Sequence, residues 1–326
     1  MSRIFRTAIQ QSKTEYPLSH PNSFLLMGSC FSENIGEKLT KYKFPTYINP
    51  FGILFNPASI AQSLDRLTDA SLFQEDDLHF QNKEWISFSH HGRFSHPDKE
   101  KCLSAINEKL VKSRAFLQTA DVLVLTLGTG ISYTYQGTVV ANCHRLPQRE
   151  FQKQMLEIQD IVSSLAKSIE KIKTVNQNIR VIFTISPVRY IKNNLMENAL
   201  SKARLIAAVH ELIRRIENSD YFPAYEIMMD DLRDYRFYNE DMIHPSPLAI
   251  DYIWDVFSHV FFSHETTRLN ALIEEIAEAR NHRLKNPLSD ETKRFKAEQL
   301  KKIQKIQSDY PYIDFEEEVR YFSTGN

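Results

Sequence analysis

The chain has 326 residues, of which 42% are hydrophobic and 25% are charged, and its formal net charge is −1. This is the composition of a globular protein with a large core, and the near-zero charge excludes the basic surface by which proteins bind nucleic acid or anionic membranes. No apolar run reaches the roughly 20 residues of a membrane span, and the first residues lack a signal-peptide pattern. We therefore expect a cytoplasmic protein, and the three widely spaced cysteines are typical of reduced thiols.

The first segment with a clear pattern, residues 23–41, is predicted to form a buried strand, a tight turn and an amphipathic helix. Residues 24–27 are all apolar, as in a strand covered on both faces, and later apolar residues follow helical spacing. Ser29 lies in the turn directly after Gly28, whose missing side chain permits a sharp corner. A serine beside the free N–H groups of a helix can attack an acyl carbon, although it can also simply cap the helix.

The segment after this helix is predicted to be a short strand or loop, residues 46–55, with Gly52 near its apex. A second helix is expected to begin at residues 57–59. A third is predicted over residues 99–119, where apolar residues recur at helical spacing.

Residues 71–100, between these helices, show no clean period. They contain the adjacent histidines His90 and His91, which raise the question of a metal site. Two adjacent histidines cannot chelate an ion from one face of a strand, and no acidic cluster accompanies them. The sequence therefore predicts no metal ion here.

The clearest buried strand after the first is residues 121–128, a nearly unbroken apolar run that ends in a glycine. Ligands of open α/β sheets bind outside the carboxyl ends of the strands, so we expect Thr129 to lie beside Ser29. Residues 131–141 are predicted to form a hairpin that turns at Gln136-Gly137.

The following elements alternate: helix 151–173, strand 180–186, helix 193–217, strand 225–229 and helix 248–262. The helix predicted over residues 193–217 is expected to turn one face inward, with Leu200, Ala203, Ile206, Ala207, His210 and Ile213. Strands that alternate with helices indicate parallel pairing. The predicted fold is therefore a three-layer α/β/α structure with a mostly parallel sheet, similar to flavodoxin.

Asp241 and His244, which follow the last predicted strand, have the spacing D-x-x-H. The carboxylate can hold one imidazole nitrogen, and the other nitrogen can then take a proton from a serine. This spacing alone is common, but together with the serine in the first turn it gives the order Ser, Asp, His of a catalytic triad. The nearby pair Asp230 and Asp231 has no third oxygen ligand at fixed spacing, so we predict no cation site.

Toward the C-terminus the sequence changes to charged helices, predicted over residues 268–283 and 289–308 with a break at Asn286-Pro287. Their apolar residues form a stripe that needs a partner surface, either on the α/β body or on a second subunit. We predict an α/β domain, residues 1–263, and a C-terminal helical arm, residues 264–326, through which the chain can form a homo-oligomer.

Several motifs, in this order along the chain, resemble those of the GSCFA domain family, a branch of the SGNH (GDSL-like) hydrolase superfamily. The most specific is Gly28-Ser29-Cys30-Phe31, and the others lie at residues 5–7, 32–36, 49–53, 126–129, 142–147, 186–188 and 241–245. Several ordered motifs are more specific than any single one. The resemblance implies an SGNH-like fold with Ser29, Asp241 and His244 as the catalytic residues.

The resemblance also implies donors for the oxyanion, which in the superfamily are N–H groups and an asparagine. Ser29 and Gly52 stand at the positions of the N–H donors, unless Gly52 is only a turn residue. Many members carry an asparagine where this chain has Gly130. Either Thr129 or Asn142 then supplies the third donor, or the oxyanion hole is weaker; Asn142 can instead anchor its own loop.

We therefore expect a serine esterase that hydrolyses a small acyl ester through an acyl-enzyme on Ser29, with no metal or cofactor. By analogy with the superfamily, an O-acetyl group on a carbohydrate is a candidate substrate. Two alternatives stay open: an O-acyltransferase with the same triad, and a binding protein on a retained hydrolase fold. The expected partner is a small-molecule or carbohydrate ester, and neither nucleic acid nor a membrane.

Overall fold

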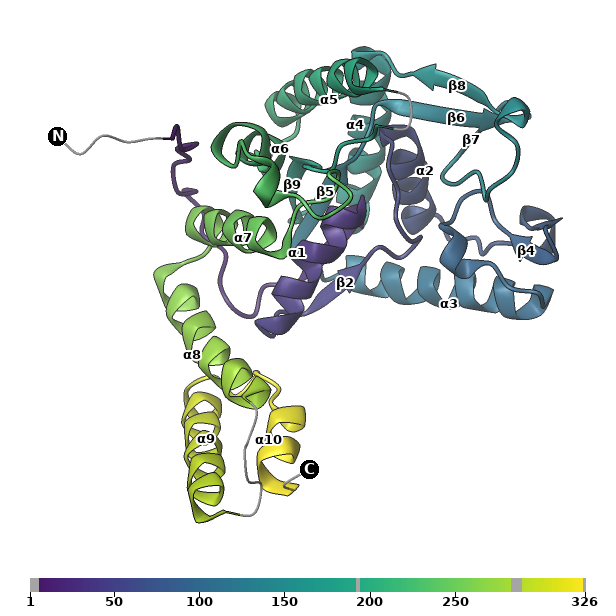
Figure 1. Ribbon diagram of the computed structural model, residues 1–326. Coiled ribbons are helices and arrows are strands. Elements are labelled where there is room, and N and C mark those ends of the chain that lie inside the picture. The colour runs from purple at the N-terminus through teal and green to yellow at the C-terminus, as the bar shows by residue number, and fades with distance from the viewer. Residues whose placement is uncertain (1–5, 192–193, 283–288, 325–326) are drawn as a thin grey trace. The chain divides into compact units, whose positions relative to one another are not determined.

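The computed structural model describes residues 6–191, 194–282 and 289–324, which form two compact units (Figure 1). The larger unit comprises three segments of the chain, within 1–11, 23–36 and 46–255. The smaller unit comprises the segments within 12–22, 37–45 and 256–326. Residue 5, residue 193 and the predicted helix break at 286–287 lie outside the described residues. The domain boundary that composition suggests after residue 263 stays a prediction.

The larger unit is built on a five-stranded parallel sheet in the order β2-β1-β5-β9-β10. Its strands are β1 (Phe24–Gly28), β2 (Thr46–Ile48), β5 (Val122–Leu127), β9 (Arg180–Ile185) and β10 (Ser219–Phe222). Every residue of β1, β5 and β9 is buried, which explains their nearly unbroken apolar runs. The strand order is that of flavodoxin, as the sequence predicts.

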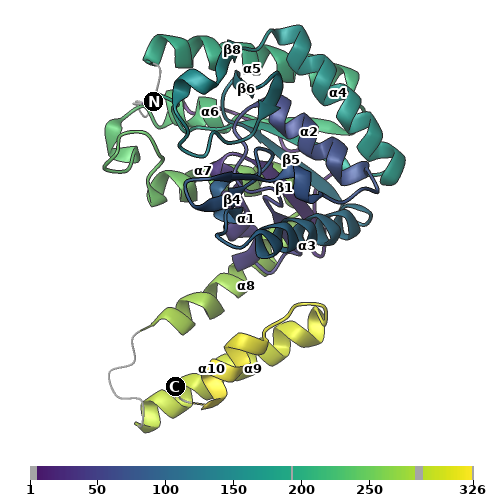
Figure 2. The same ribbon diagram turned by 90° about the vertical axis from the view of Figure 1, so that its right-hand side faces the viewer.

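Helices cover both faces of this sheet (Figures 1 and 2). One face packs against α2 (Pro57–Thr68), α3 (Lys99–Leu117), α4 (Ile158–Val175) and α5 (Leu195–Arg215). The other face is covered by the first residues of α1 (Cys30–Lys41) and of α7 (Pro247–Phe261). There the Ser32 hydroxyl donates to Thr126 Oγ1 of β5 over 2.7 Å. The three-layer α/β/α architecture is confirmed.

Two small antiparallel sheets flank the central one. One pairs β3 (His79–Gln81) with β4 (Glu84–Ile86), and the other places β7 (Thr138–Val140) and β8 (Gln152–Met155) on either side of β6 (Ile131–Tyr135). Short 3₁₀ helices lie at Glu75–Asp77, Gly92–Phe94, Gln148–Glu150 and Tyr235–Phe237. The β6–β7 hairpin turns at Gln136-Gly137 as predicted, with both residues at positive φ. No helix within the described part of the chain is long and apolar enough to cross a membrane.

The helix predicted over residues 151–173 begins later than expected, at Ile158. Residues 152–155 instead form β8, which pairs with β6 and places Met155 opposite Ile131. These four residues, Gln-Lys-Gln-Met, include only one apolar residue, so their pattern favours neither a helix nor a strand. Strand β6, however, needs a second partner for its backbone N–H and C=O groups, and β8 supplies it. Pairing with a distant strand thus overrides the local pattern.

The strand predicted over residues 225–229 is wrong. The last strand of the sheet is β10, and it ends before Pro223, which cannot donate a hydrogen bond to a strand neighbour but can begin a helix. Helix α6 (Ala224–Glu226) and a π-helical segment, Ile227–Asp231, follow. A short apolar run fits a buried helix as well as a strand, and Pro223 decides between them here.

In the smaller unit, three helices pack on one another: α8 (His264–Asn281), α9 (Asp290–Asp309) and α10 (Glu316–Thr324). Their shared core contains Leu269, Ile273, Ile276, Ile303, Ile306, Ile313, Phe315 and Phe322, and Tyr42 packs against it. The predicted apolar stripe on α8 and α9 therefore finds a partner surface within this unit. Helix α10, which the sequence pattern does not predict, supplies part of that surface.

We expect a chain that ends at Ser263 to aggregate or to change its oligomeric state. Without α8 to α10, Tyr42 would lose its apolar packing. Lys41 and Lys43 would also lose their ion pairs with Glu274 (2.6 Å) and Glu318 (2.8 Å). Size-exclusion chromatography of the truncated and full chains would measure this. A truncated protein that is soluble and folded but lacks turnover would show instead that these helices help to build the site.

Candidate active site

Ser29 occupies the turn between β1 and α1, at the carboxyl end of the sheet. The preceding Gly28 has φ +137°, and a Cβ atom there would lie 2.1 Å from the carbonyl oxygen of Thr126. Only glycine fits this close approach of β1 and β5. The turn is further fixed because Ser29 N–H donates to that same oxygen over 3.1 Å.

The Ser29 hydroxyl accepts a hydrogen bond from Phe31 N–H over 3.3 Å, so this serine does cap the helix. It also lines a cavity of about 350 Å³, although the residue as a whole is only 1% exposed. Capping and access to a ligand therefore coexist, and the two interpretations of Ser29 left by the sequence do not exclude each other.

The cavity at Ser29 lies where β1, β5 and β9 end, because Gly128, Thr129 and Ser186, which follow β5 and β9, line it too. His244 also lines it. The remaining wall is mostly apolar and includes Phe55, Val188, Ile191 and Ile243. The topology thus brings Ser29 to the same cavity as His244, which lies more than two hundred residues later in the chain. This is expected for an open α/β sheet.

Asp241 and His244 form a close pair, with Asp241 Oδ2 2.6 Å from His244 Nδ1. The other carboxylate oxygen accepts from the backbone N–H groups of His244 (3.0 Å) and Ile243 (2.9 Å). The His244 N–H, its imidazole and the Ile243 N–H lower the pKa of Asp241 to about 2. An ionised carboxylate can only accept, so His244 Nδ1 carries a proton and Nε2 is left to act as a base.

Arg189, which sequence analysis missed, holds the loop that carries this pair. Its guanidinium donates to the carbonyl oxygen of Met242 and lies over the rings of Tyr238 (4.4 Å to the centroid) and Tyr235 (5.3 Å). Arg189 follows β9, and its own backbone N–H reaches Ile243 O at 3.5 Å. A lone arginine in a loop carries no sequence signal of its partners.

Lys202 was also missed, and it lies beneath the site. Its side chain is fully buried, and Nζ donates over 2.7 Å to the carbonyl oxygens of both Gly128 and Ser186, at the ends of β5 and β9. Burial lowers the pKa of Lys202 to about 7. This lysine ties together the two strand ends that border the cavity.

The buried face of α5 differs from the predicted one, which explains why Lys202 was overlooked. The residues that face the core are Leu205, Ala208, Val209 and Leu212, together with Ser201 and Lys202. By contrast, Leu200 is 51% exposed. The predicted and the observed sets of buried residues both have helical spacing. Because the observed face includes a lysine, it appears less apolar in the sequence than the predicted face beside it.

Of the predicted oxyanion donors, Thr129 lines the Ser29 cavity, but Gly52 and Asn142 do not. Gly52 N–H donates to Asn49 O (2.8 Å) in a turn where φ of Gly52 is +79°. The Thr129 hydroxyl lies 3.0 Å from Ser201 Oγ and accepts from Ile131 N–H. Asn142 Oδ1 accepts from His144 N–H (2.8 Å), the bond expected of a loop anchor. The N–H of Ser29, the fourth predicted donor, is bonded to Thr126 O. The roles of all four as oxyanion donors stay predictions.

Cys30, next to Ser29, also lines the cavity and is half-buried. Burial, and to a lesser extent Glu33, raises the pKa of its thiol. The thiol therefore stays protonated at neutral pH, and a protonated thiol is a poor nucleophile.

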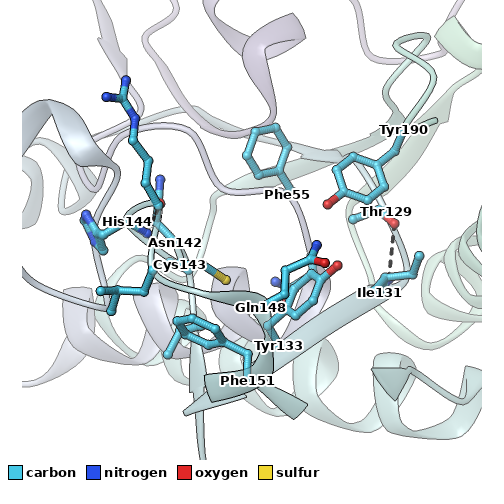
Figure 3. Close-up of a pocket in the computed structure, with 15 residues that line it drawn as sticks. Phe55, Thr129, Ile131, Tyr133, Asn142, Cys143, His144, Gln148, Phe151 and Tyr190 are labelled. Carbon is cyan, nitrogen blue, oxygen red and sulfur yellow. Dashed lines mark hydrogen bonds between the residues drawn. The ribbon is translucent and has the colours of Figure 1, made fainter. Parts of the chain in front are cut away.

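A second cavity, of about 270 Å³, adjoins the first and shares Phe55, Thr129 and Tyr190 with it (Figure 3). The loop after β7 delivers Asn142 and His144 to it. The His144 imidazole bonds to Ser87 O at 2.8 Å, and its pKa is lowered mainly by burial. The residues that follow the predicted hairpin, Asn142 and His144, therefore line the second cavity and not the cavity at Ser29.

The histidines of residues 71–100 do not assemble a metal site in the part of the chain that the structure describes, where no group of three or more His, Cys, Asp or Glu is placed to hold an ion. His90 is buried, with its ring stacked on Phe51 at 5.2 Å and its Nδ1 2.9 Å from Ser87 Oγ. Burial lowers the pKa of His90 to about 3, so it is a neutral core residue.

Residues 23–257 match the GSCFA family, and residues 273–325 match the C-terminal domain of GSCFA domain proteins. No curated protein matches the chain. Among solved structures, a family 3 carbohydrate esterase of Clostridium thermocellum is 11% identical, over 77% of this chain and 98% of that one, with a TM-score of 0.35. A carbohydrate esterase family 3 protein from Talaromyces cellulolyticus is 9% identical, over 78% and 99%, with a TM-score of 0.37.

These structural likenesses are too low to carry an argument about activity. The family match is different, because it extends over well over half of the 326 residues and includes the strand-turn-helix corner at Ser29 and the Asp241 and His244 pair. The chain therefore belongs to the GSCFA family.

Proposed function

We propose that this protein is a serine hydrolase of small acyl esters, with Ser29 as nucleophile, His244 as general base and acid, and Asp241 as the residue that orients His244. The observation that carries the proposal is that Ser29 and His244 line one cavity while the Asp241 carboxylate holds His244 Nδ1. A nucleophile, a base and an orienting carboxylate are the parts that acyl transfer needs.

The steps follow from this arrangement. His244 Nε2 takes the proton of Ser29 Oγ as Oγ bonds to the ester carbonyl carbon. His244 then gives that proton to the alcohol oxygen as its bond to carbon breaks, which leaves the acyl group on Ser29. A water molecule enters, gives a proton to His244 and attacks the acyl carbon, and the acid leaves as Ser29 recovers its proton.

The developing oxyanion needs N–H donors that are free in the resting protein. Cys30 supplies one, because it lines the cavity and its N–H, at the first position of α1, has no acceptor within the helix. The +½ charge at the start of a helix acts in the same direction. In this proposal the backbone of Cys30 assists catalysis, while its side chain takes no part.

An O-acyltransferase uses the same acyl-enzyme and differs only in what intercepts it, an acceptor alcohol or water. The second cavity, which shares Phe55, Thr129 and Tyr190 with the cavity at Ser29, gives such an acceptor a place to bind. O-acetyl groups on a carbohydrate are the substrate class that family resemblance implies for either reaction.

Turnover of 4-nitrophenyl acetate by the purified protein, compared with Ser29→Ala and Cys30→Ala, tests the proposal. We expect Ser29→Ala to be inactive and Cys30→Ala, which keeps the backbone N–H, to retain most of the activity. Equal turnover in the wild type and Ser29→Ala would mean that the cavity only binds ligands. Formation of acetylated sugar, when sugar alcohols are added, would identify the transferase.

A further inference from the structure

Lys202 places a buried amino group at the carboxyl end of the sheet, and the proposed reaction does not use it. The residue is 1% exposed, and its Nζ donates to Gly128 O and Ser186 O, each over 2.7 Å. Gly128 and Ser186 also line the cavity at Ser29. The amino group of Lys202 therefore lies directly behind two residues of the cavity wall.

This buried group has no paired anion. No carboxylate in the described part of the chain lies within 4.0 Å of Lys202 Nζ. The titratable groups around it are Cys30 of α1 and Tyr225 and Glu226 of α6. Nζ lies 5.3 Å from the centre of the Tyr225 ring, and Tyr225 stays neutral because burial raises its pKa. Glu226 acts on Lys202 only at longer range, and its carboxylate oxygens lie 2.7 Å from Tyr221 Oη. When Lys202 is charged, it therefore favours a negative charge that forms nearby.

We propose that the ammonium group of Lys202 stabilises the anion that forms when Ser29 attacks an ester, and thereby speeds acyl transfer. It acts from behind the wall that Gly128 and Ser186 form and does not touch the substrate. Lys202 is therefore a positioning residue of the site and not a member of the triad. This inference rests on the proposed function, because it assigns a source of positive charge to the same reaction.

The charge of Lys202 acts on a residue of the cavity lining. Cys30 adjoins Ser29 and lines the cavity; burial raises the pKa of its thiol, and the charge of Lys202 partly opposes this rise. The start of α1, at Cys30, carries a partial charge of the same sign. A charge that is fixed in place before the reaction stabilises a developing anion well, because nothing has to rearrange when the anion forms.

Lys202 can lose its charge and still hold the wall of the cavity. A neutral amine keeps two N–H groups, which is the number that Gly128 O and Ser186 O require. Burial lowers the pKa of Lys202 to about 7, so the charge is present at about pH 6 and largely absent at about pH 9. An effect of the charge on catalysis is therefore greatest at pH 6. The contribution of Lys202 to stability has the opposite trend, because the unfolded chain binds the proton more tightly.

The first test is the turnover of 4-nitrophenyl acetate by the wild type and Lys202→Met between pH 6 and pH 9. We expect kcat of the variant to be about 10- to 100-fold lower at pH 6 and the difference to shrink toward pH 9. Protonation of the base His244 lowers kcat of both proteins, so their ratio largely removes its effect. Lys167→Met, at a lysine exposed on α4, should leave kcat unchanged at every pH. A ratio that is constant, or largest at pH 9, is expected of a purely structural lysine and would overturn the inference.

The second test leaves Lys202 unchanged and separates the inference from the proposed function. The double variant Ser29→Ala, His244→Ala lacks the nucleophile and the histidine of the cavity, the residue type that ordinarily titrates near neutral pH. Its binding of butyrate, an anion, and of the uncharged butyramide is followed by NMR. We expect the affinity for butyrate to fall about three- to tenfold from pH 6 to pH 9, while butyramide binds equally at both.

The two proposals can fail separately in these experiments. Turnover by the wild type together with equal affinity for butyrate at pH 6 and pH 9 would overturn the inference and leave the hydrolase standing. Binding of butyrate that weakens with pH as expected, without turnover of any ester by the wild type, would support the charge of Lys202 and overturn the hydrolase.

Discussion

Asp241→Asn is expected to lower turnover of 4-nitrophenyl acetate by about three to four powers of ten while ligand binding changes little. The carboxylate accepts from His244 Nδ1 and from two backbone N–H groups, and its pKa of about 2 keeps it ionised at every pH suitable for an assay. An asparagine keeps the shape but can turn its NH₂ group toward Nδ1. The proton of the imidazole then moves to Nε2, which can no longer accept from Ser29.

His244→Ala should be at least as damaging, and the double variant should lose little more than either single one, because members of one proton-transfer unit are strongly non-additive. Single-turnover kinetics of the wild type, both single variants and the double variant would measure this. If the two losses multiplied as independent effects, or if Asp241→Asn kept near-normal turnover, the catalytic assignment of this pair would have to be abandoned.

The second large effect is expected on stability, from Lys202→Met. The substitution keeps the length of the side chain but removes the donor to Gly128 O and Ser186 O, and each buried carbonyl left without a donor costs about 1–3 kcal/mol. Above pH 7 the wild-type lysine is largely neutral and still donates two hydrogen bonds. The variant should therefore be clearly less stable than the wild type near pH 9.

This deficit should shrink as the pH falls from about 9 to 7. The pKa of Lys202 is about 7 in the folded protein and about 10.4 in an unfolded chain. Between these values the unfolded state binds the extra proton, so lowering the pH favours unfolding of the wild type by up to about 1.4 kcal/mol per pH unit. Below pH 7 both states are protonated and the difference becomes constant.

Urea unfolding of the wild type and Lys202→Met across this pH range would measure the effect. Lys167→Met is the matched control, because it makes the same substitution at a lysine that is exposed on α4. Parallel pH dependences of the wild type and Lys202→Met would show that the buried lysine does not titrate as its surroundings suggest.

The sheet could be predicted from sequence because β1, β5 and β9 are buried on both faces and therefore appear as nearly unbroken apolar runs. Residues 152–155 and 225–229 could not: the first segment has only one apolar residue, and the second is a short, largely apolar run that fits helix and strand alike. Their state is decided by a partner strand in the first case and by Pro223 in the second. In both cases the secondary structure depends on a tertiary contact or on a single residue, and hydrophobic periodicity reports neither.

The candidate site also contains some residues that the sequence predicts and others that it does not. Asp241 and His244 are three residues apart and meet in a local turn, and Ser29 carries its own signature in the preceding glycine. Arg189 and Lys202 act on backbone carbonyls that are distant in sequence, so nothing next to them indicates their role. The second cavity is likewise a product of tertiary structure, because its wall comes from several separate segments.

The most direct test of the account is covalent labelling of the wild-type protein by a fluorophosphonate, with the modified residue identified by mass spectrometry. We predict a single label on Ser29, and none in His244→Ala at the same exposure time, because Ser29 Oγ reacts only when its proton can be taken. A label on Cys30, or no label while the protein still hydrolyses 4-nitrophenyl acetate, would contradict Ser29 as the nucleophile.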